Sequence, residues 1–214
     1  MTRKNRDIPT TSKVLPFGTQ PSLPAVPRAA DKIRRTAREL FYRDGIRAIG
    51  VDEIVTRAGV TKPSLYRSFP SKDELAAAYL RDYDAEFWER YAAYLDPAAN
   101  ENPREGLLNY LRLLCARAGS ADYRGCGLSN TAVEYPDSAH PARKVSEDHK
   151  DKLRCRLSEV AAAMGAADPA RLGDGLMLLI EGAFVTGQIF RKGNGPAIAL
   201  VDAAERLIDS HLRR

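Results

Sequence analysis

Two short helical patterns, separated by a sharp turn at Gly59, limit the folds that this chain can adopt. The apolar residues of the stretches 51–58 and 62–69 each recur at helical spacing, which places them on one side of a short helix. Thr61 is a good N-cap for the second stretch, and Pro63 lies in its first turn, where a missing N–H costs nothing. Gly59 can adopt the positive φ that such a corner requires. The spacing therefore predicts a helix-turn-helix.

Helical periodicity continues through the rest of the chain. No stretch of any length alternates with period two, and no internal repeat is present, so the fold class is all-α. Around the helix-turn-helix we expect helices over 29–44, 71–95, 107–118, 141–164, 169–191 and 197–212, with a short segment at 128–135.

Residues 1–28 differ from the rest because they hold five of the chain's 13 prolines and show no periodicity. We expect a flexible basic arm. Its cationic side chains would add non-specific affinity for phosphate. The alternative is an unstructured terminus with no role in binding.

Charge is distributed unevenly. Residues 1–72 hold 15 Lys or Arg and 6 Asp or Glu, whereas the remaining 142 residues hold 18 basic and 22 acidic side chains. This asymmetry is typical of an N-terminal module that binds a polyanion and is joined to a mildly acidic body. A soluble protein with a basic tail would show it too.

Composition excludes several classes. With 214 residues, 44% of them apolar and 29% charged, the chain resembles a globular protein. Its apolar runs are far shorter than the ~20 residues of a membrane span, and no secretory signal is recognisable. Cys115, Cys126 and Cys155 are too few and too scattered for a disulfide framework or a zinc site. We expect a cytoplasmic protein without metal or cofactor.

The second short helix of the helix-turn-helix offers a polar face. With its apolar residues inward, the opposite side is cationic and short enough for a major groove about 12 Å wide; it presents Thr61, Lys62, Ser64, Tyr66 and Arg67. Lys72 begins the next helix, where its charge opposes the helix dipole. A phosphate partner would explain that position, and so would simple solvation.

These residues carry a resemblance. The stretches 37–45 (ARELFYRDG), 51–54 (VDEI) and 58–75 (AGVTKPSLYRSFPSKDEL) resemble the N-terminal domain of TetR-family transcriptional regulators, over about residues 31–80. The segment 125–127 and the helix start at His140 and Pro141 resemble one branch of that family.

The resemblance implies a role for each matching residue. Thr61, Lys62, Ser64 and Arg67 would line the DNA face, Tyr66 and Lys72 would hold phosphates, and residues near Gly50 and Val51 would approach the DNA backbone. Gly50 departs from the Ser or Thr common in the family, which leaves only its backbone N–H for such a contact. Val55 stands where the family often has Ala.

The resemblance also implies an organisation. Residues 29–76 would be the DNA-binding domain, and 77–214 a helical ligand-binding and dimerisation domain. The last two helices would form a four-helix bundle in a homodimer that binds a palindromic operator. The apolar faces of these two helices fit a dimer interface. Packing inside a single chain would account for part of the same apolar faces. A small-molecule effector would release the DNA, and repression is the commoner polarity.

The effector pocket is described poorly by the sequence. Candidate lining residues are Trp88, Leu111, Cys115, Tyr135, His149, Met177, Glu181 and Phe184. His149 would contact a ligand, or it would be a core histidine whose hydrogen bonds are made within the protein. Glu181, if buried, needs a cationic ligand or an arginine as partner. Cys126 would be either a reactive thiol or an unreactive small side chain packed in the core.

Catalysis finds no support. The segment 125–130 lacks the last glycine of a dinucleotide fingerprint and follows no strand, and 127–131 fails as a nucleophile elbow. His140 and His149 lack metal-ligand spacing. A helical adaptor without a DNA role is the remaining alternative, but it leaves the polar face at 61–67 and the charge asymmetry unexplained. We expect a regulator, not an enzyme.

Overall fold

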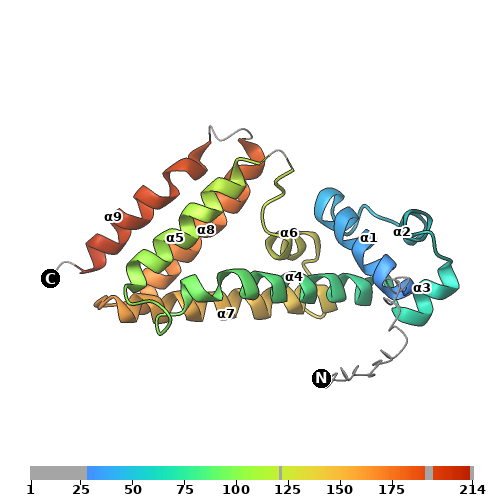
Figure 1. Ribbon diagram of the computed structural model, residues 1–214, viewed down its shortest axis with the longest axis horizontal. Helices are drawn as coiled ribbons and strands as arrows, with labels where there is room; N and C mark the ends of the chain where they lie inside the picture. The colour runs from blue at the N-terminus through green and yellow to red at the C-terminus, as the bar shows by residue number, and fades with distance from the viewer. Residues whose placement is uncertain (1–27, 121, 191–194, 213–214) are drawn as a thin grey trace, which may run out of the picture.

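The structure is a computed structural model that describes residues 28–120, 122–190 and 195–212. The predicted arm at 1–28 therefore lies, apart from Arg28, outside the described residues. The described part is helical throughout, which confirms the all-α class (Figure 1). Its elements are α1 (Ala29–Asp44), α2 (Val51–Ala58), α3 (Lys62–Ser68), α4 (Lys72–Leu95), α5 (Pro103–Ala118), α6 (Gly127–Glu134), α7 (Pro141–Ala163), α8 (Pro169–Ile189), the 3₁₀ turn η1 (Pro196–Ala199) and α9 (Leu200–Leu212).

The first three helices enclose a small core of their own. Ile33 and Leu40 from α1, Ile54 from α2 and Leu65 from α3 are all buried. Gly59 ends α2 in the left-handed conformation, with φ 64° and ψ 40°. The turn therefore has the geometry that its glycine predicts, and it holds α3 across α1 and α2.

Helix α4 connects this unit to the rest of the molecule. It begins at a Ser71 N-cap whose side chain accepts a hydrogen bond from the Glu74 N–H. It packs against α1, α5 and α7. Because α4 runs without interruption through residue 76, the two predicted domains share one rigid element.

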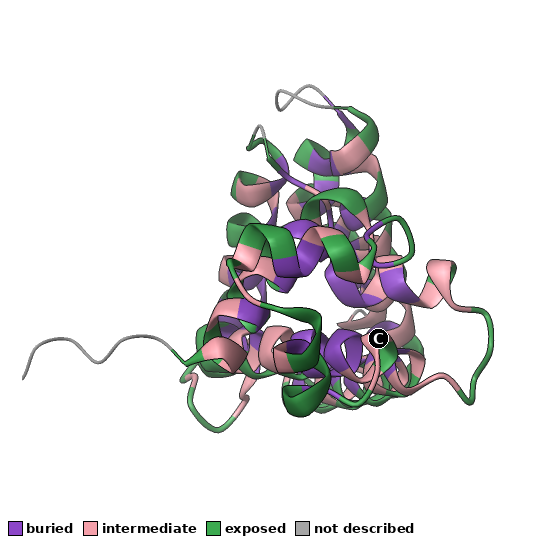
Figure 2. Cartoon of the chain, turned by 90° about the vertical axis from the view of Figure 1, so that its right-hand side faces the viewer, coloured by how far each residue is buried: buried purple, intermediate pink, exposed green. Residues whose placement is uncertain are grey.

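The larger part consists of α5, α7, α8 and α9, with α7 and α8 packed closely together (Figure 1). Gly173 makes this approach possible, because a Cβ there would lie 2.9 Å from the Ser158 backbone nitrogen. Buried residues follow the inner faces of the helices and exposed residues the outer faces (Figure 2). The core that results is continuous with that of the first three helices.

Helix α8 is apolar enough, by length and composition alone, to cross a membrane, with a mean hydropathy of 1.2. Glu181 and the glycines interrupt its apolar runs, so no long unbroken run is present in the sequence of α8. Leu172, Leu176 and Ile180 are fully buried against the neighbouring helices, which accounts for part of this apolar character.

Several element ends differ from the sequence-based expectation. Helix α3 ends at Ser68, so Phe69 is its C-cap, and α5 begins at Pro103 behind an Asn102 N-cap. The last predicted helix starts with the turn η1, and α8 ends at Ile189 rather than 191. These shifts of a few residues are usual at helix ends, where caps decide the boundary.

Gly45, the C-cap of α1, has an unusual backbone conformation. Its φ is positive, 90°, but its ψ of 153° lies outside the left-handed helical region. A Cβ at Gly45 would lie 3.0 Å from a carboxylate oxygen of Glu134 in α6, so this close approach leaves little room for a side chain. The same carboxylate accepts a hydrogen bond from the Arg47 N–H at 2.8 Å, and the Arg47 side chain donates to the Glu134 carbonyl at 3.2 Å.

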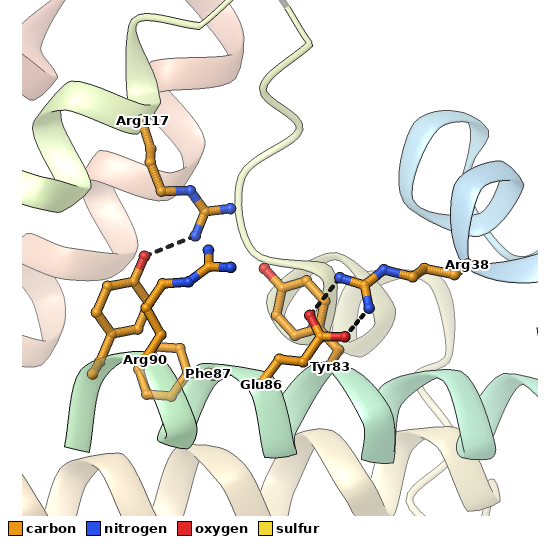
Figure 3. A pocket seen from close by; sticks show the side chains of 7 residues that line it. Arg38, Tyr83, Glu86, Phe87, Arg90 and Arg117 are labelled. Atoms are coloured by element: carbon orange, nitrogen blue, oxygen red, sulfur yellow. Dashed lines mark hydrogen bonds and ion pairs between the residues drawn. The ribbon is translucent and has the colours of Figure 1, made fainter. Parts of the chain in front are cut away.

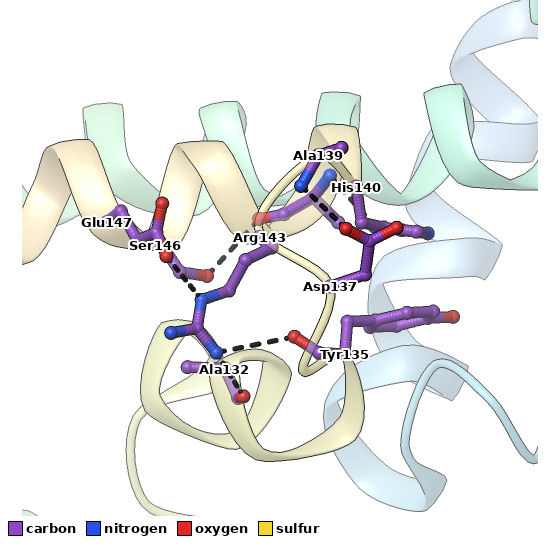
Figure 4. Close-up of polar contacts among 9 residues, drawn as sticks. Ala132, Tyr135, Asp137, Ala139, His140, Arg143, Ser146 and Glu147 are labelled. Atoms are coloured by element: carbon purple, nitrogen blue, oxygen red, sulfur yellow. Dashed lines mark hydrogen bonds and ion pairs between the residues drawn. The ribbon is translucent and has the colours of Figure 1, made fainter.

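The C-terminal end of α6 is held in turn by α7. The guanidinium of Arg143 donates to the carbonyl oxygens of Ala132 at 2.7 Å and Tyr135 at 3.3 Å, and to the Glu147 carboxylate at 2.7 Å (Figure 4). The loop that α6 presents to the α1–α2 turn is therefore anchored to the body of the protein.

Candidate nucleic-acid interface

Helix α3 exposes the face that the sequence predicts. Leu65 is fully buried and Phe69 is 8% exposed, so both anchor α3 to the core. Thr61, Lys62 and Arg67 are exposed on the opposite side, with Ser64 partly covered, and the Tyr66 side chain is 49% exposed.

Hydrogen bonds order this face. The Thr61 hydroxyl caps α3 by accepting from the Ser64 N–H at 3.4 Å, and the two hydroxyls lie 3.0 Å apart. Arg67 donates to the Ser64 hydroxyl at 3.0 Å. The polar groups are thereby held along one side of α3, where they remain open to a ligand.

Lys62 has a partner that the sequence analysis did not identify. Its ammonium lies 2.7 Å from the Asp52 carboxylate of α2. This hydrogen bond raises the pKa of Lys62. The pair is solvent-exposed and links the two helices of the helix-turn-helix, and spacing alone could not have revealed it because it depends on their crossing.

The remaining predicted DNA contacts lie beside the exposed face of α3 rather than on it. Gly50 is the exposed N-cap of α2, Val51 is half-buried behind it, and a Cβ at Gly50 would meet nothing within 4 Å. The Lys72 ammonium lies 3.4 Å from the Arg47 carbonyl, beside the α1–α2 turn rather than on the α3 face. Burial lowers its pKa. Lys72 is thus partly covered, unlike a simply solvated lysine.

Comparison with known proteins agrees with this architecture. The family model for bacterial regulatory proteins of the tetR family matches residues 33–79. A crystal structure of a tetR transcriptional regulator from Streptomyces avermitilis covers 87% of this chain and 99% of its own, with 33% identity and a TM-score of 0.77. The chain belongs to the TetR family. This is a family of DNA-binding transcriptional regulators.

Other relatives of this TetR-family protein are more distant or match it in part. A TetR-family regulator from Streptomyces coelicolor has 27% identity, a TM-score of 0.80, and coverage of 87% of this chain and 97% of its own. The transcriptional repressor KstR2 of Mycolicibacterium smegmatis is 35% identical over 80 residues, which are 37% of this chain and 38% of that protein. The transcriptional activator FasR of the same species is 53% identical over 45 residues, 21% of this chain and 20% of its own length. These names are all of regulators, which agrees with the expectation of a non-enzymatic protein.

The eight predicted effector-pocket residues do not share one described cavity. Trp88 and His149 are neighbours, with ring centroids 5.9 Å apart. Cys115 donates to the Ala197 carbonyl at 3.1 Å, whereas Tyr135 stacks on His140 at 3.9 Å near the α6–α7 loop. Leu111 is fully buried in α5 and Met177 is half-buried in α8. Their assignment to a pocket remains a prediction.

Glu181 and Phe184 gather around Lys150. The Glu181 carboxylate accepts from the Lys150 ammonium at 2.6 Å and from the Ser129 hydroxyl at 2.7 Å. The partner is therefore a lysine, neither of the two that the sequence suggested. The same ammonium lies 5.1 Å from the centre of the Phe184 ring and 3.6 Å from the Cys126 sulfur.

His149 has the environment of a core residue. Its side chain is 1% exposed, its Nδ1 lies 2.7 Å from an Asp84 carboxylate oxygen, and its ring packs edge-on against Phe87. Burial lowers the pKa of His149, and the Asp84 hydrogen bond opposes this in part. The lowered pKa favours the neutral ring at pH 7, and a neutral ring can donate to the Asp84 carboxylate only through a proton on Nδ1.

Sequence reasoning missed a cavity of about 50 Å³ between α1, α4 and α5. Three guanidinium groups line it, those of Arg38, Arg90 and Arg117, with Glu86 and aromatic side chains of α4 (Figure 3). No motif could have found it, because the arginines come from three helices and each alone resembles an ordinary surface residue.

Proposed function

We propose that this TetR-family protein is a ligand-responsive, sequence-specific transcriptional repressor. It binds a palindromic DNA operator as a homodimer in the cytoplasm, and a small molecule releases it. The observation that carries the proposal is the exposed cationic face of α3, held outward by the burial of Leu65 and Phe69. A face of this kind at the end of a helix-turn-helix fits the major groove.

The proposal assigns roles along this interface. Thr61, Lys62, Ser64 and Arg67 meet base edges and phosphates, while Tyr66 and Lys72 hold phosphates. The peptide backbone at Gly50 and Val51 approaches the DNA backbone, because exposed N–H groups at a helix start favour phosphate oxygens. The DNA-binding domain is 29–76, and 77–214 binds the effector and dimerises.

The outer surface of α8 and η1 supports the homodimer. Large apolar side chains are exposed there: Leu178 (74%), Ile189 (65%) and Ile198 (67%). An apolar groove of about 210 Å³ runs between α8, η1 and α9. A Cβ at Gly182 on this face would meet nothing within 4 Å, so a helix of a second copy can approach closely. Exposed apolar patches of this extent mark association surfaces.

The connections between the two proposed domains support regulation. Helix α4 crosses the boundary, and Glu134 of α6 holds the α1–α2 turn through Arg47. A ligand that favours one arrangement of the body therefore biases the separation of the two α3 helices in the dimer. Differential affinity for the two arrangements is what releases the DNA.

Selection of bound fragments from random duplex DNA tests the central claim. We expect a palindromic site whose half-sites are spaced by about one helical turn, 10–10.5 base pairs, or a multiple of it. Affinity for the selected duplex should fall steeply with salt, since several phosphates are neutralised. Failure to enrich any sequence, with a flat salt response, would leave the adaptor as the better description.

Arg67→Ala sharpens the test. Loss of one base or phosphate contact should weaken binding to the selected duplex by ~1–3 kcal/mol, with the melting temperature unchanged. The control is Arg154→Ala, an exposed arginine of α7 that pairs with Asp174 of α8. Equal affinities for the Arg67 variant and the wild type would remove Arg67 from the interface. A promoter assay then decides the sign of regulation.

A further inference from the structure

The cavity between α1, α4 and α5 holds more positive than negative charge. Arg38, Arg90 and Arg117 line it, together with a single carboxylate, that of Glu86. Glu86 is already engaged: it forms a two-pronged ion pair with Arg38, whose second contact is 2.5 Å long. The other two guanidinium groups therefore share the cavity without a carboxylate of their own.

Arg117 and Arg90 both point into the space between α4 and α5 (Figure 3). Arg117 is half-buried and donates to the Tyr91 hydroxyl at 2.9 Å. Arg90 lies against the Tyr91 ring at 5.9 Å. Among the described residues, neither has a carboxylate within 4 Å. Two guanidinium groups that face the same small cavity repel each other, and this repulsion favours an anion between them.

The shape of the cavity agrees with its charge. A volume of about 50 Å³ holds a few water molecules, each of which needs roughly 10–15 Å³, or one group of carboxylate or phosphate size. Guanidinium groups match the planar geometry of such oxyanions. The rings of Phe87, Tyr83 and Tyr91 complete the lining and offer an apolar contact to the body of an organic anion.

We propose that this cavity binds the oxyanion group of a small acidic effector, a carboxylate or a phosphate, between Arg90 and Arg117. The bound anion lies beside Glu86, so the two negative charges repel each other and compete for Arg38. Because Arg38 belongs to α1 and Glu86 to α4, this competition loosens α1 from α4 and lowers DNA affinity. The regulatory half of this inference rests on the proposed function.

Calorimetric titration of the full chain tests the site. The probes are sodium benzoate and inorganic phosphate at constant ionic strength, with benzylamine and benzyl alcohol as matched cationic and neutral controls. We expect benzoate, phosphate or both to bind and the two controls to give no heat of binding. If benzoate alone binds, the effector is a carboxylate; if phosphate alone binds, it is a phosphoryl compound.

Variants locate the anion. Arg117→Gln should weaken its binding by about tenfold or more, the usual effect of removing a hydrogen bond to a charged group. Arg90→Gln should weaken it as well and, because Arg90 is exposed, leaves packing intact. Arg112→Gln is the control, since this arginine of α5 pairs with Glu105 outside the cavity. Absence of binding by both anions, or equal loss in the control, would overturn the proposal.

The two proposals can fail separately. In a fluorescence anisotropy assay with the selected duplex, the anion that binds should lower DNA affinity for the wild type and not for Arg117→Gln. If the duplex binds but neither anion does, the effector inference is wrong and the proposed function stands. If an anion binds and no duplex does, the proposed function is wrong and the anion site stands. Anion binding without any effect on DNA affinity would refute the regulatory half alone.

Discussion

The guanidinium of Arg38 and the carboxylate of Glu86 form a two-pronged ion pair that joins α1 of the DNA-binding unit to α4, 48 residues farther along the chain. Arg34 and Asp82, one turn earlier on each helix, reinforce it at 3.6 Å. The hydrogen bonds from Arg38 lower the pKa of Glu86 and raise that of Arg38. The ion pair therefore adds an electrostatic link between α1 and α4 beside their apolar contact.

Glu86→Gln should reveal the strength of this pair. Both side chains are about two-fifths exposed, 44% and 40%, so solvent screens the interaction. We expect the unfolding free energy at pH 7 to fall by ~0.2–1 kcal/mol, the range for exposed ion pairs. Because the pKa of Glu86 is lowered in the folded state, its contribution is complete above its ordinary value of 4.5 and is lost as pH falls through the folded pKa.

Urea unfolding at pH 7 and at pH 3.5 measures both effects. The difference between wild type and Glu86→Gln should shrink at the lower pH. Glu89→Gln, on the same helix and without an ion pair among the described residues, is the control and should match the wild type at both. A constant difference across this pH range would mean that Glu86 does not act through its charge.

The buried His149 predicts an acid-sensitive body. Burial lowers the pKa of His149 below the ordinary 6.5. Between the folded and unfolded pKa values, the unfolded state therefore binds a proton that the folded state does not. Its contribution to the unfolding free energy is therefore complete above pH 6.5 and declines as pH falls toward the folded pKa. His149→Gln keeps a donor for Asp84 but cannot titrate, so it should lose this part of the pH dependence.

Denaturant unfolding between pH 7.5 and pH 5 checks this. The wild type should lose stability more steeply than His149→Gln over that range. His211→Gln, near the end of α9, is the matched control and should keep the wild-type slope. Parallel slopes for wild type and His149→Gln would show that the histidine is not kept neutral by burial.

The exposed face of α8 predicts the oligomeric state. Leu178→Asp places a charge where the side chain is 74% exposed in the single chain, so folding should be unaffected. If this face is buried in a homodimer, the unpaired carboxylate should disfavour association by several kcal/mol and yield a monomer. Light scattering after gel filtration measures the mass directly.

Leu113→Asp is the control for that experiment, because Leu113 of α5 is also an exposed leucine, at 39%. It should leave the dimer intact. A wild-type chain that is monomeric at all concentrations, or a Leu178→Asp variant that is as dimeric as the wild type, would contradict the proposed interface.

The local features of this protein could be predicted from residues that lie close together in the sequence. Helical periodicity, the N-cap at Thr61 and the glycine at 59 predicted the elements and the helix-turn-helix, because each depends on residues a few positions apart. The exposed face of α3 followed for the same reason: once Leu65 is inward, the position of Arg67 on the opposite side is set by the helical repeat.

Contacts between groups that are distant in the sequence could not be predicted in this way. The pairing of Glu181 with Lys150, of Glu134 with the turn at Gly45, and of Arg38 with Glu86 depends on how helices cross, and helical spacing carries no information about crossing. The arginine cavity is the clearest case. Its charges come from three helices, and their convergence arises from the packing of α1 and α5 around α4.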